Sequence, residues 1–223
     1  MTADIARRTA AEMIGTALLL AAIVGSGIMA ERLAGGSTAL ALLVNAVATG
    51  AALFALILTF APISGAHFNP LVTVATAAAG RMRWRAVTPY VLAQLAGGVA
   101  GVWLAHLMFD LPILQLSSRQ RSGLGQWTGE VTATFGLIAV IDSGRRHFST
   151  ALPAAVAAYI TAAYWFTSST SFANPAVTLA RALTDTFTGI APGGVTPFIL
   201  AQCVGAAAAV ALFRWLAEAP AAR

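Results

Sequence analysis

Ser64-Gly-Ala-His-Phe-Asn-Pro-Leu71 and Ser171-Phe-Ala-Asn-Pro-Ala-Val177 each carry an Asn-Pro pair at the start of an apolar segment. The two segments, 69–79 and 174–187, are too short to cross a bilayer, which takes about 20 apolar residues. Asn is a favoured N-cap residue, and Pro suits the first helical position because it lacks an N–H group. Asn69-Pro70 and Asn174-Pro175 therefore predict the starts of two short helices.

The chain around these segments has the composition of a membrane protein. Hydrophobic residues make up 58% of it and charged residues 9%, about a third of the charged share in soluble domains. Six stretches approach the length of a membrane span: 12–30, 38–60, 87–109, 127–144, 151–168 and 195–217. The single cysteine, Cys203, excludes a disulfide within the chain.

The basic residues predict how the spans are oriented. All 13 are arginines, and they lie in short runs between apolar segments, without the basic patch that a nucleic-acid partner would need. Most fall on one side of the predicted membrane: Arg7, Arg8, Arg81, Arg83, Arg85, Arg145, Arg146, Arg214 and Arg223. That side is predicted to be cytoplasmic, with both termini on it, and the apolar run after Arg7-Arg8 is interpreted as a retained first span.

Three sequence patterns recur in the same order in the two halves of the chain. Glu12-Met-Ile-Gly-Thr16 matches Glu130-Val-Thr-Ala-Thr134, the two Asn-Pro segments match, and 87–94 matches 195–202, at offsets of 118, 105 and 108 residues. Each half has three spans, so the second half must enter the membrane from the opposite face. The sequence predicts one domain, 1–223, built from inverted repeats at about 8–110 and 126–218.

Opposed entry would bring the two short helices tip to tip near the middle of the bilayer. Their N-termini would then put partial positive charge on the axis of a lumen, which repels cations and hydrated protons. The Asn amides would also offer donors to a molecule in the lumen.

The paired Asn-Pro boxes resemble the Asn-Pro-Ala boxes of the aquaporin (major intrinsic protein) family, and the likeness extends from Glu12 to about Leu216. The resemblance implies an all-α membrane protein with six tilted transmembrane helices and two re-entrant half-helices. It also implies a homotetramer in the lipid bilayer, with one pore in each subunit. Leu71 departs from the first box, whereas Ala176 keeps the second, and the bulk of Leu71 is expected to alter the central constriction.

Two carboxyl groups in apolar segments, those of Glu12 and Glu130, need buried donors. The irregular chain before each half-helix has unpaired N–H groups, so we expect both carboxylates to brace these loops, as the matching residues do in the family. Gln94 and Gln202 are expected to do similar work. His67 is expected to be a buried, hydrogen-bonded side chain rather than a ligand or a proton relay.

The selectivity filter is where the sequence departs from the family. Most members have an arginine directly after the second Asn-Pro-Ala, and this chain has Val177. Carried over by distance from the Asn residues, the other filter positions are Thr49, Ala162 and either Ser171 or Phe172. This set is small and weakly polar, so it predicts an aperture wider than a water-only filter.

Arg181 lies four residues after Val177, on the same helix face and one turn further outward. One interpretation is an Arg181–Asp185 or headgroup interaction without a role in selection. The other is that Arg181 borders the outer vestibule and attracts polar or anionic solutes to a wide entrance.

The departures at Leu71 and Val177 resemble a bacterial aquaglyceroporin subgroup associated with arsenic handling. That resemblance implies a passive channel of the cytoplasmic (inner) membrane for water and small neutral solutes, such as polyols, arsenous acid or methylated arsenicals. The alternatives are a water-selective aquaporin and, less favoured, a secondary transporter. The sequence has no Ser–His pair, carboxylate dyad or metal-ligand cluster, so it predicts no enzyme, cofactor or metal site.

Overall fold

The computed structural model describes residues 2–217, and every regular element among them is helical. Met1 and residues 218–223, which include Arg223 and the end of the second predicted repeat, lie outside the described residues. The elements are α1 (Thr2–Leu33), α2 (Thr38–Ser64), α3 (Pro70–Ala78), the 3-10 turn η1 (Trp84–Ala86), α4 (Val87–Met108), α5 (Leu124–His147), α6 (Leu152–Phe166), α7 (Pro175–Arg181) and α8 (Pro192–Ala217).

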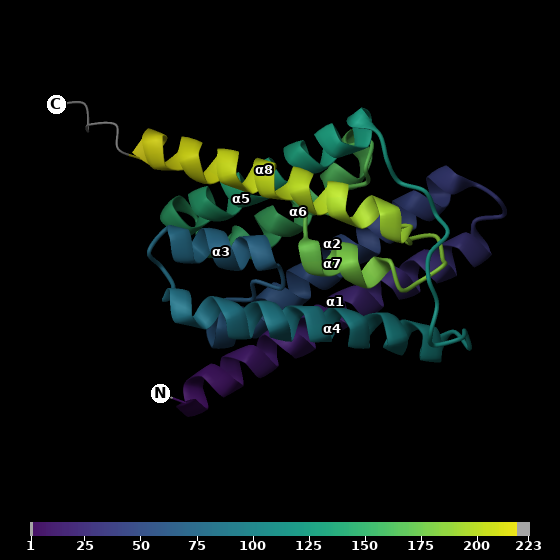
Figure 1. Ribbon diagram of the computed structural model, residues 1–223, viewed down its shortest axis with the longest axis horizontal. Coiled ribbons are helices and arrows are strands. Elements are labelled where there is room, and N and C mark those ends of the chain that lie inside the picture. The colour runs from purple at the N-terminus through teal and green to yellow at the C-terminus, as the bar shows by residue number, and fades with distance from the viewer. Residues whose placement is uncertain (1, 218–223) are drawn as a thin grey trace.

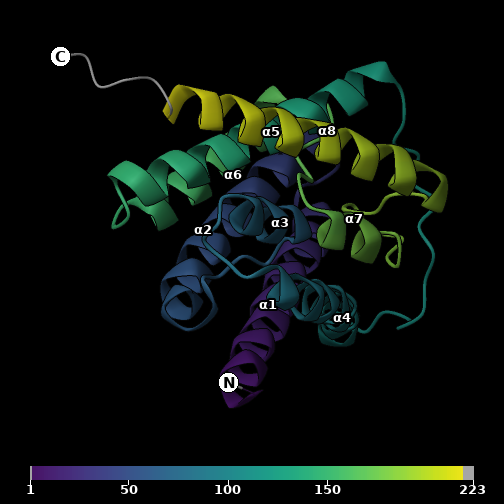
Figure 2. The same ribbon diagram turned by 60° about the vertical axis from the view of Figure 1, so that its left-hand side comes forward.

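The same order of elements occurs twice along the chain. In the first half α1 packs on α2 and α4, and in the second half α5 packs on α6 and α8. The contact between α2 and α6 joins the halves, and each short helix lies between long helices of both: α3 against α4 and α8, and α7 against α4 and α8 (Figures 1 and 2). Helix α1 begins and α8 ends at the same end of the molecule (Figure 1).

Four of the long helices are apolar enough over their length to cross a membrane: Asp4–Leu33, Thr38–Ser64, Trp84–Met108 and Pro192–Leu216. Helix α5 has 24 residues, but Glu130, Asp142, Arg145 and Arg146 lower its mean hydropathy. Helix α6 is apolar but has only 15 residues, about 22 Å of helix against a hydrocarbon core of about 30 Å. These two helices take the places in the second half that α1 and α2 take in the first, which completes the predicted six.

Two glycines at matching positions lie at close helix crossings. A Cβ built on Gly97 of α4 would overlap the carbonyl oxygen of Met13 in α1, and one on Gly205 of α8 would overlap that of Val131 in α5. Only glycine lets these backbones touch, as is common where membrane helices cross.

The second short helix is shorter than the sequence predicts. It was expected to continue to about Phe187, but it ends at Arg181. The N–H of Ile190 donates to the Arg181 carbonyl, and the N–H of Ser117 donates to that of Ala182. Because these chain segments satisfy the terminal carbonyls, the helix stops and residues 182–191 form an irregular loop.

Candidate functional site

The two Asn-Pro pairs form the N-termini of α3 and α7. Asn69 and Asn174 have extended backbones, and their Oδ1 atoms accept N–H groups of the first turn, from Leu71 at 2.9 Å and from Ala176 at 2.9 Å. Proline occupies the next position in both helices. Each start therefore has the cap chemistry that the sequence predicts.

The two asparagines also tie the halves together. Asn69 Nδ2 donates to the carbonyl of Ala173 at 2.8 Å, and Asn174 Nδ2 donates to the carbonyl of Phe68 at 2.8 Å. Each amide thus bonds the loop that precedes the opposite half-helix. The second N–H of each amide has no acceptor among the described residues, and both asparagines line the central cavity.

Each loop before a half-helix is held by a fully buried glutamate. Glu12 accepts the N–H groups of His67 and Phe68 at 2.9 and 2.7 Å, and also bonds the Ser64 hydroxyl and the Gln94 amide. Several residues of this loop and its counterpart have positive φ: Ala66, Phe68, Thr170, Ser171 and Ala173. The left-handed conformation costs non-glycine residues about 1–2 kcal/mol each, so the hydrogen bonds to the carboxylates offset that cost.

Glu130 repeats this arrangement in the second half. Its carboxylate accepts the N–H groups of Phe172 and Ala173 at 2.8 and 2.9 Å and the Gln202 amide at 2.6 Å. Gln202 also donates to the Thr178 hydroxyl, as Gln94 does to that of Thr73. These contacts match the supporting role expected for the glutamates and glutamines.

The His67 side chain is also buried and hydrogen-bonded within the protein. It is 8% exposed, and its Nδ1 lies 3.1 Å from the Thr73 hydroxyl. Its ring also borders the central cavity.

A cavity of about 80 Å³ runs between the two halves. Most of its wall is aliphatic: Leu19, Ile23, Leu53, Ile57, Val72, Leu137, Ile141, Leu152, Val156, Ile160 and Val177. The polar residues on the wall are Thr49, His67, Asn69, Arg145, Tyr164, Ser171, Asn174 and Arg181. We call this cavity the lumen. It has a wide apolar surface and a smaller set of donors and acceptors that includes both asparagines.

Four of the five predicted filter residues border the lumen, and Ala162 does not. Thr49, Ser171, Phe172 and Val177 are all buried and line it. The assignment of Ala162 needs correction, because this residue is exposed on the outer side of α6.

Tyr164 takes the place on the lumen wall that was assigned to Ala162. The lumen-facing residues of α6 are Leu152, Val156, Ile160 and Tyr164, spaced at one turn of helix. The Tyr164 hydroxyl lies 3.2 Å from that of Thr49, so a polar pair stands where a small apolar side chain was expected.

The rest of the two Asn-Pro boxes lies outside the lumen wall. Pro70, Pro175 and Ala176 are buried in the packing of the half-helices. Leu71 is half-buried and packs against the core rather than on the lumen. The expected effect of its bulk on the central constriction is therefore not supported by its position.

Arg181 lies on the lumen wall and makes no ion pair with Asp185. Its guanidinium carbon sits 3.4 Å from the centre of the Phe172 ring, and its Nε donates to the carbonyl of Thr188. Asp185 instead accepts the backbone N–H and the hydroxyl of Ser118, and these two bonds hold the pKa of Asp185 below its usual value. Because α7 ends at Arg181, Asp185 does not continue its face.

Arg121, in the loop between α4 and α5, has its guanidinium carbon 5.1 Å from the centre of the Phe172 ring. Its Nε donates to the Gly189 carbonyl at 2.8 Å. Burial is the main cause that lowers the pKa of Arg121. Two guanidinium groups therefore lie close to the same aromatic ring, which borders the lumen.

Three lumen or vestibule residues were not singled out from the sequence: Tyr164, Arg121 and Arg145. Tyr164 offered one signal, as a polar aromatic residue in an apolar span, but nothing local indicated which face of the helix it occupied.

Among residues 2–217 no group of three or more His, Cys, Asp or Glu side chains could hold a metal ion.

Comparison with known proteins agrees with this geometry. Residues 1–147 match the family described as Major intrinsic protein. The chain is 54% identical over 215 residues to "Aquaglyceroporin AqpS" of Rhizobium meliloti (strain 1021). The matched residues make up 96% of this chain and 92% of that protein. It is 29% identical over 202 residues to "Aquaporin-10" of Milnesium tardigradum, covering 90% of this chain and 44% of that one.

The fold is also similar to a solved structure, the aquaglyceroporin from Plasmodium falciparum. The TM-score is 0.72 at 21% identity, over 94% of this chain and 95% of that one. Together with the paired half-helices and the lumen between them, these findings show that the chain belongs to the major intrinsic protein family and is an integral membrane channel for small solutes, not an enzyme.

Proposed function

We propose that this channel passes small uncharged polyhydroxy solutes, of the class of glycerol and arsenous acid, together with water. The observation that carries the proposal is Val177. It lies on the lumen wall at the position where most of the family has an arginine, so the constriction lacks the side chain that narrows a water-selective filter. The aquaglyceroporin relative supports the same class of solute.

The distribution of polar groups in the lumen suits such a solute. A polyol has hydroxyl groups on a compact apolar frame, and the lumen offers donors and acceptors from Thr49, Tyr164 and the two asparagines beside an aliphatic wall. Hydroxyl groups exchange their water for these polar side chains, while the frame slides over the aliphatic surface.

In this proposal Arg181 supplies the cationic donors that Val177 lacks. Its Nε is used by Thr188, and its two terminal nitrogens have no acceptor among residues 2–217. The cation–π contact with Phe172 holds the guanidinium group at the outer part of the lumen. A solute therefore meets a donor one helical turn outside the usual filter position.

Exclusion of protons is assigned to the opposed N-termini of α3 and α7. The partial positive charge of two helix starts on the axis is the established explanation for cation exclusion in aquaporin-type pores. The reciprocal bonds of Asn69 and Asn174 support this assignment, since they hold the two helix starts together.

The proposal also covers the setting of the channel. One domain, 1–223, is built from inverted repeats at about 8–110 and 126–218 and forms a homotetramer in the lipid bilayer of the inner membrane. The arginine-rich end, where α1 begins and α8 ends, is assigned to the cytoplasm by the positive-inside rule.

The Val177→Arg variant in proteoliposomes tests the proposal. Stopped-flow light scattering gives the entry rates of glycerol, arsenous acid and water for the variant and the unchanged protein. We expect the arginine to reduce solute entry far more than water entry, because its side chain would extend into the lumen from a buried position.

Cys203→Ser, on the exposed side of α8, is the matched control and should keep all three rates. Solute entry that is unaffected by Val177→Arg would contradict the filter assignment. Fast water entry without solute entry in the unchanged protein would instead favour a water-selective channel.

A further inference from the structure

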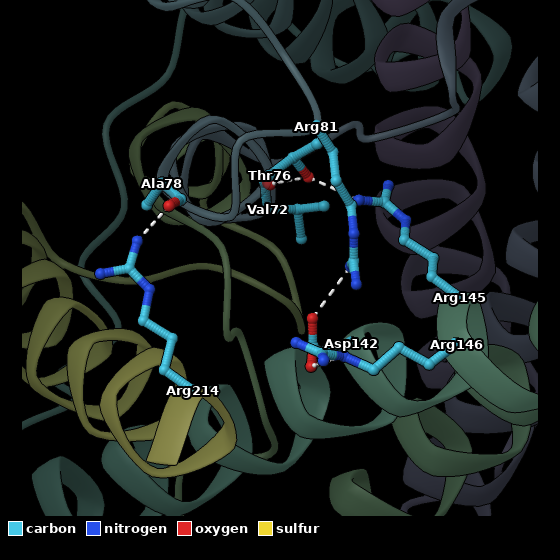
Figure 3. Close-up of polar contacts among 8 residues, drawn as sticks. All are labelled: Val72, Thr76, Ala78, Arg81, Asp142, Arg145, Arg146 and Arg214. Atoms are coloured by element: carbon cyan, nitrogen blue, oxygen red, sulfur yellow. Dashed lines mark hydrogen bonds and ion pairs between the residues drawn. The ribbon is translucent and has the colours of Figure 1, made fainter. Parts of the chain in front are cut away.

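A second cavity of about 160 Å³ lies at the arginine-rich end of the molecule, between α3, α5 and α8. Four arginines border it: Arg81 beyond the end of α3, Arg145 and Arg146 in α5, and Arg214 in α8. Figure 3 shows their side chains converging from different elements around this space, with Asp142 between them. We call it the basic cavity.

The charges around the basic cavity do not balance. Asp142 is the one carboxylate among its lining residues, and it is shared by Arg81 at 2.9 Å and Arg146 at 2.8 Å. Four guanidinium groups and one carboxylate leave three positive charges at a single cavity.

Two of the four arginines have only neutral partners. Arg145 donates to the Thr76 hydroxyl at 2.7 Å, and Arg214 donates to the carbonyl of Ala78. Neither forms a salt bridge with a described residue. They reach the cavity from α5 and from α8 (Figure 3), so their unneutralised charges face a common space.

The basic cavity adjoins the lumen. Val72, Ile141 and Arg145 line both. An ion held by Arg145 would therefore sit beside the inner mouth of the lumen, where it could change the width of the path and the local potential.

We propose that the basic cavity binds a phosphate-type oxyanion and that its occupancy reduces flux through the lumen. Arginine matches tetrahedral oxyanions because its planar fork of N–H groups can bond two oxygens at once. A divalent anion would neutralise most of the excess charge. About 10–15 Å³ of such space holds one water, so the basic cavity has room for an oxyanion and hydrating waters. The inference does not depend on which neutral solute the channel passes.

The phosphate can be free in solution or be the headgroup of an anionic lipid, and flux measurements separate the two. In vesicles of phosphatidylcholine alone, a free-phosphate site predicts that flux falls when inorganic phosphate replaces chloride at constant ionic strength. A headgroup site predicts lower flux in vesicles that contain phosphatidic acid, without added phosphate. The effect of the anion is the solute entry rate of a variant divided by the rate of the same variant in phosphatidylcholine vesicles with chloride.

Two substitutions with opposite expected effects test the residues. Arg145→Gln should weaken the phosphate or phosphatidic acid effect roughly tenfold or more, since a bond to a charged group is lost. Asp142→Asn should strengthen the effect, because it removes the competing carboxylate and frees Arg81 and Arg146. The control is Arg119→Gln, because Arg119 is exposed and paired with Glu31 at the opposite end of the molecule. This variant should keep both the phosphate effect and the phosphatidic acid effect unchanged.

If the four arginines only brace the end of α3, phosphate and phosphatidic acid will have no more effect than chloride and phosphatidylcholine, and the proposal is wrong. It is equally wrong if Arg145→Gln and Asp142→Asn both leave the anion effect unchanged. The proposal predicts that Asp142→Asn strengthens the anion effect. A folding defect in Arg145→Gln therefore cannot account for a negative result.

Discussion

Replacing Glu130 with glutamine tests whether its carboxylate holds the loop before α7. The side chain is fully buried, and its two oxygens receive three donors: the N–H groups of Phe172 and Ala173 and the amide of Gln202. Glutamine has nearly the same shape, but it exchanges one acceptor for an NH₂ group.

The cost follows from counting donors. In either orientation of the new amide, the NH₂ group faces at least one backbone N–H, that of Phe172 or that of Ala173. An unpaired buried donor costs about 1–3 kcal/mol, and the remaining bonds lose about 1 kcal/mol when their acceptor becomes neutral. We expect Glu130→Gln to destabilise the protein by about 2–4 kcal/mol. Glu130→Ala leaves both N–H groups unpaired, at about 2–6 kcal/mol, with a further cost for the cavity.

Thermal unfolding of the purified channel in detergent measures the effect. For a chain of this size, 2 kcal/mol corresponds to about 4–8 °C in the midpoint. Glu31→Gln is the matched control, because its carboxylate is 47% exposed and paired with Arg119 at the surface. An exposed pair of this kind contributes about 0–1 kcal/mol.

The reasoning is refuted if Glu130→Gln unfolds at the same midpoint as the unchanged protein and keeps its solute flux. It is also refuted if Glu31→Gln is the more destabilised of the two. Either result would mean that the left-handed loop keeps its shape without the carboxylate.

Three further substitutions address the close crossing of α5 and α8, the lumen axis and the outer mouth. Gly205→Ala should destabilise the protein by about 1–3 kcal/mol, as overpacking does, because its Cβ would overlap a backbone carbonyl. Thermal unfolding measures this effect. The control Gly193→Ala has open space around the new Cβ and should leave the unfolding midpoint nearly unchanged. Asn69→Asp should admit cations, measured as a proton leak after a pH jump, because a carboxylate on the axis opposes the helix dipoles. A leak no larger than that of Asn45→Asp, which is buried away from the lumen, would contradict this. Arg181→Ala should reduce the discrimination between glycerol and a longer polyol, measured as the ratio of their entry rates, and an unchanged ratio would show that the guanidinium group does not contact the solute.

The half-helices could be predicted because their signals are local. A helix that begins in the membrane interior needs a cap for its first N–H groups, and Asn followed by Pro meets that need within two residues. The matching glutamates and glutamines could be predicted for a related reason. A buried carboxylate must find donors, and the irregular chain before each half-helix has unpaired N–H groups.

The filter could be predicted only in part. Thr49 and Val177 line the lumen as expected, but the assignment of Ala162 rests on its distance along the chain from Asn174. The count passes through residues 167–173, where Thr170, Ser171 and Ala173 have left-handed backbone. Counting along such a loop does not preserve the helical face, so Tyr164 was missed.

The end of α7 could not be predicted for a different reason. The apolar pattern continues past Arg181, which favoured a longer helix and placed Asp185 on the same face. In the folded protein, Ser117 and Ile190 take the terminal carbonyls instead. Ser117 is more than sixty residues away in the chain, and no local pattern indicates its approach.

Contiguous residues are thus enough to predict the class of protein, the duplication and the two opposed half-helices, because each depends on burying apolar length and capping backbone groups within a few residues. The rotation of each long helix about its axis, which puts Tyr164 on the lumen and Ala162 outside it, follows from packing between helices that are distant in sequence. The same holds for the basic cavity. Arg81, Arg145 and Arg214 come from three separate elements, and only the packed molecule brings their charges together.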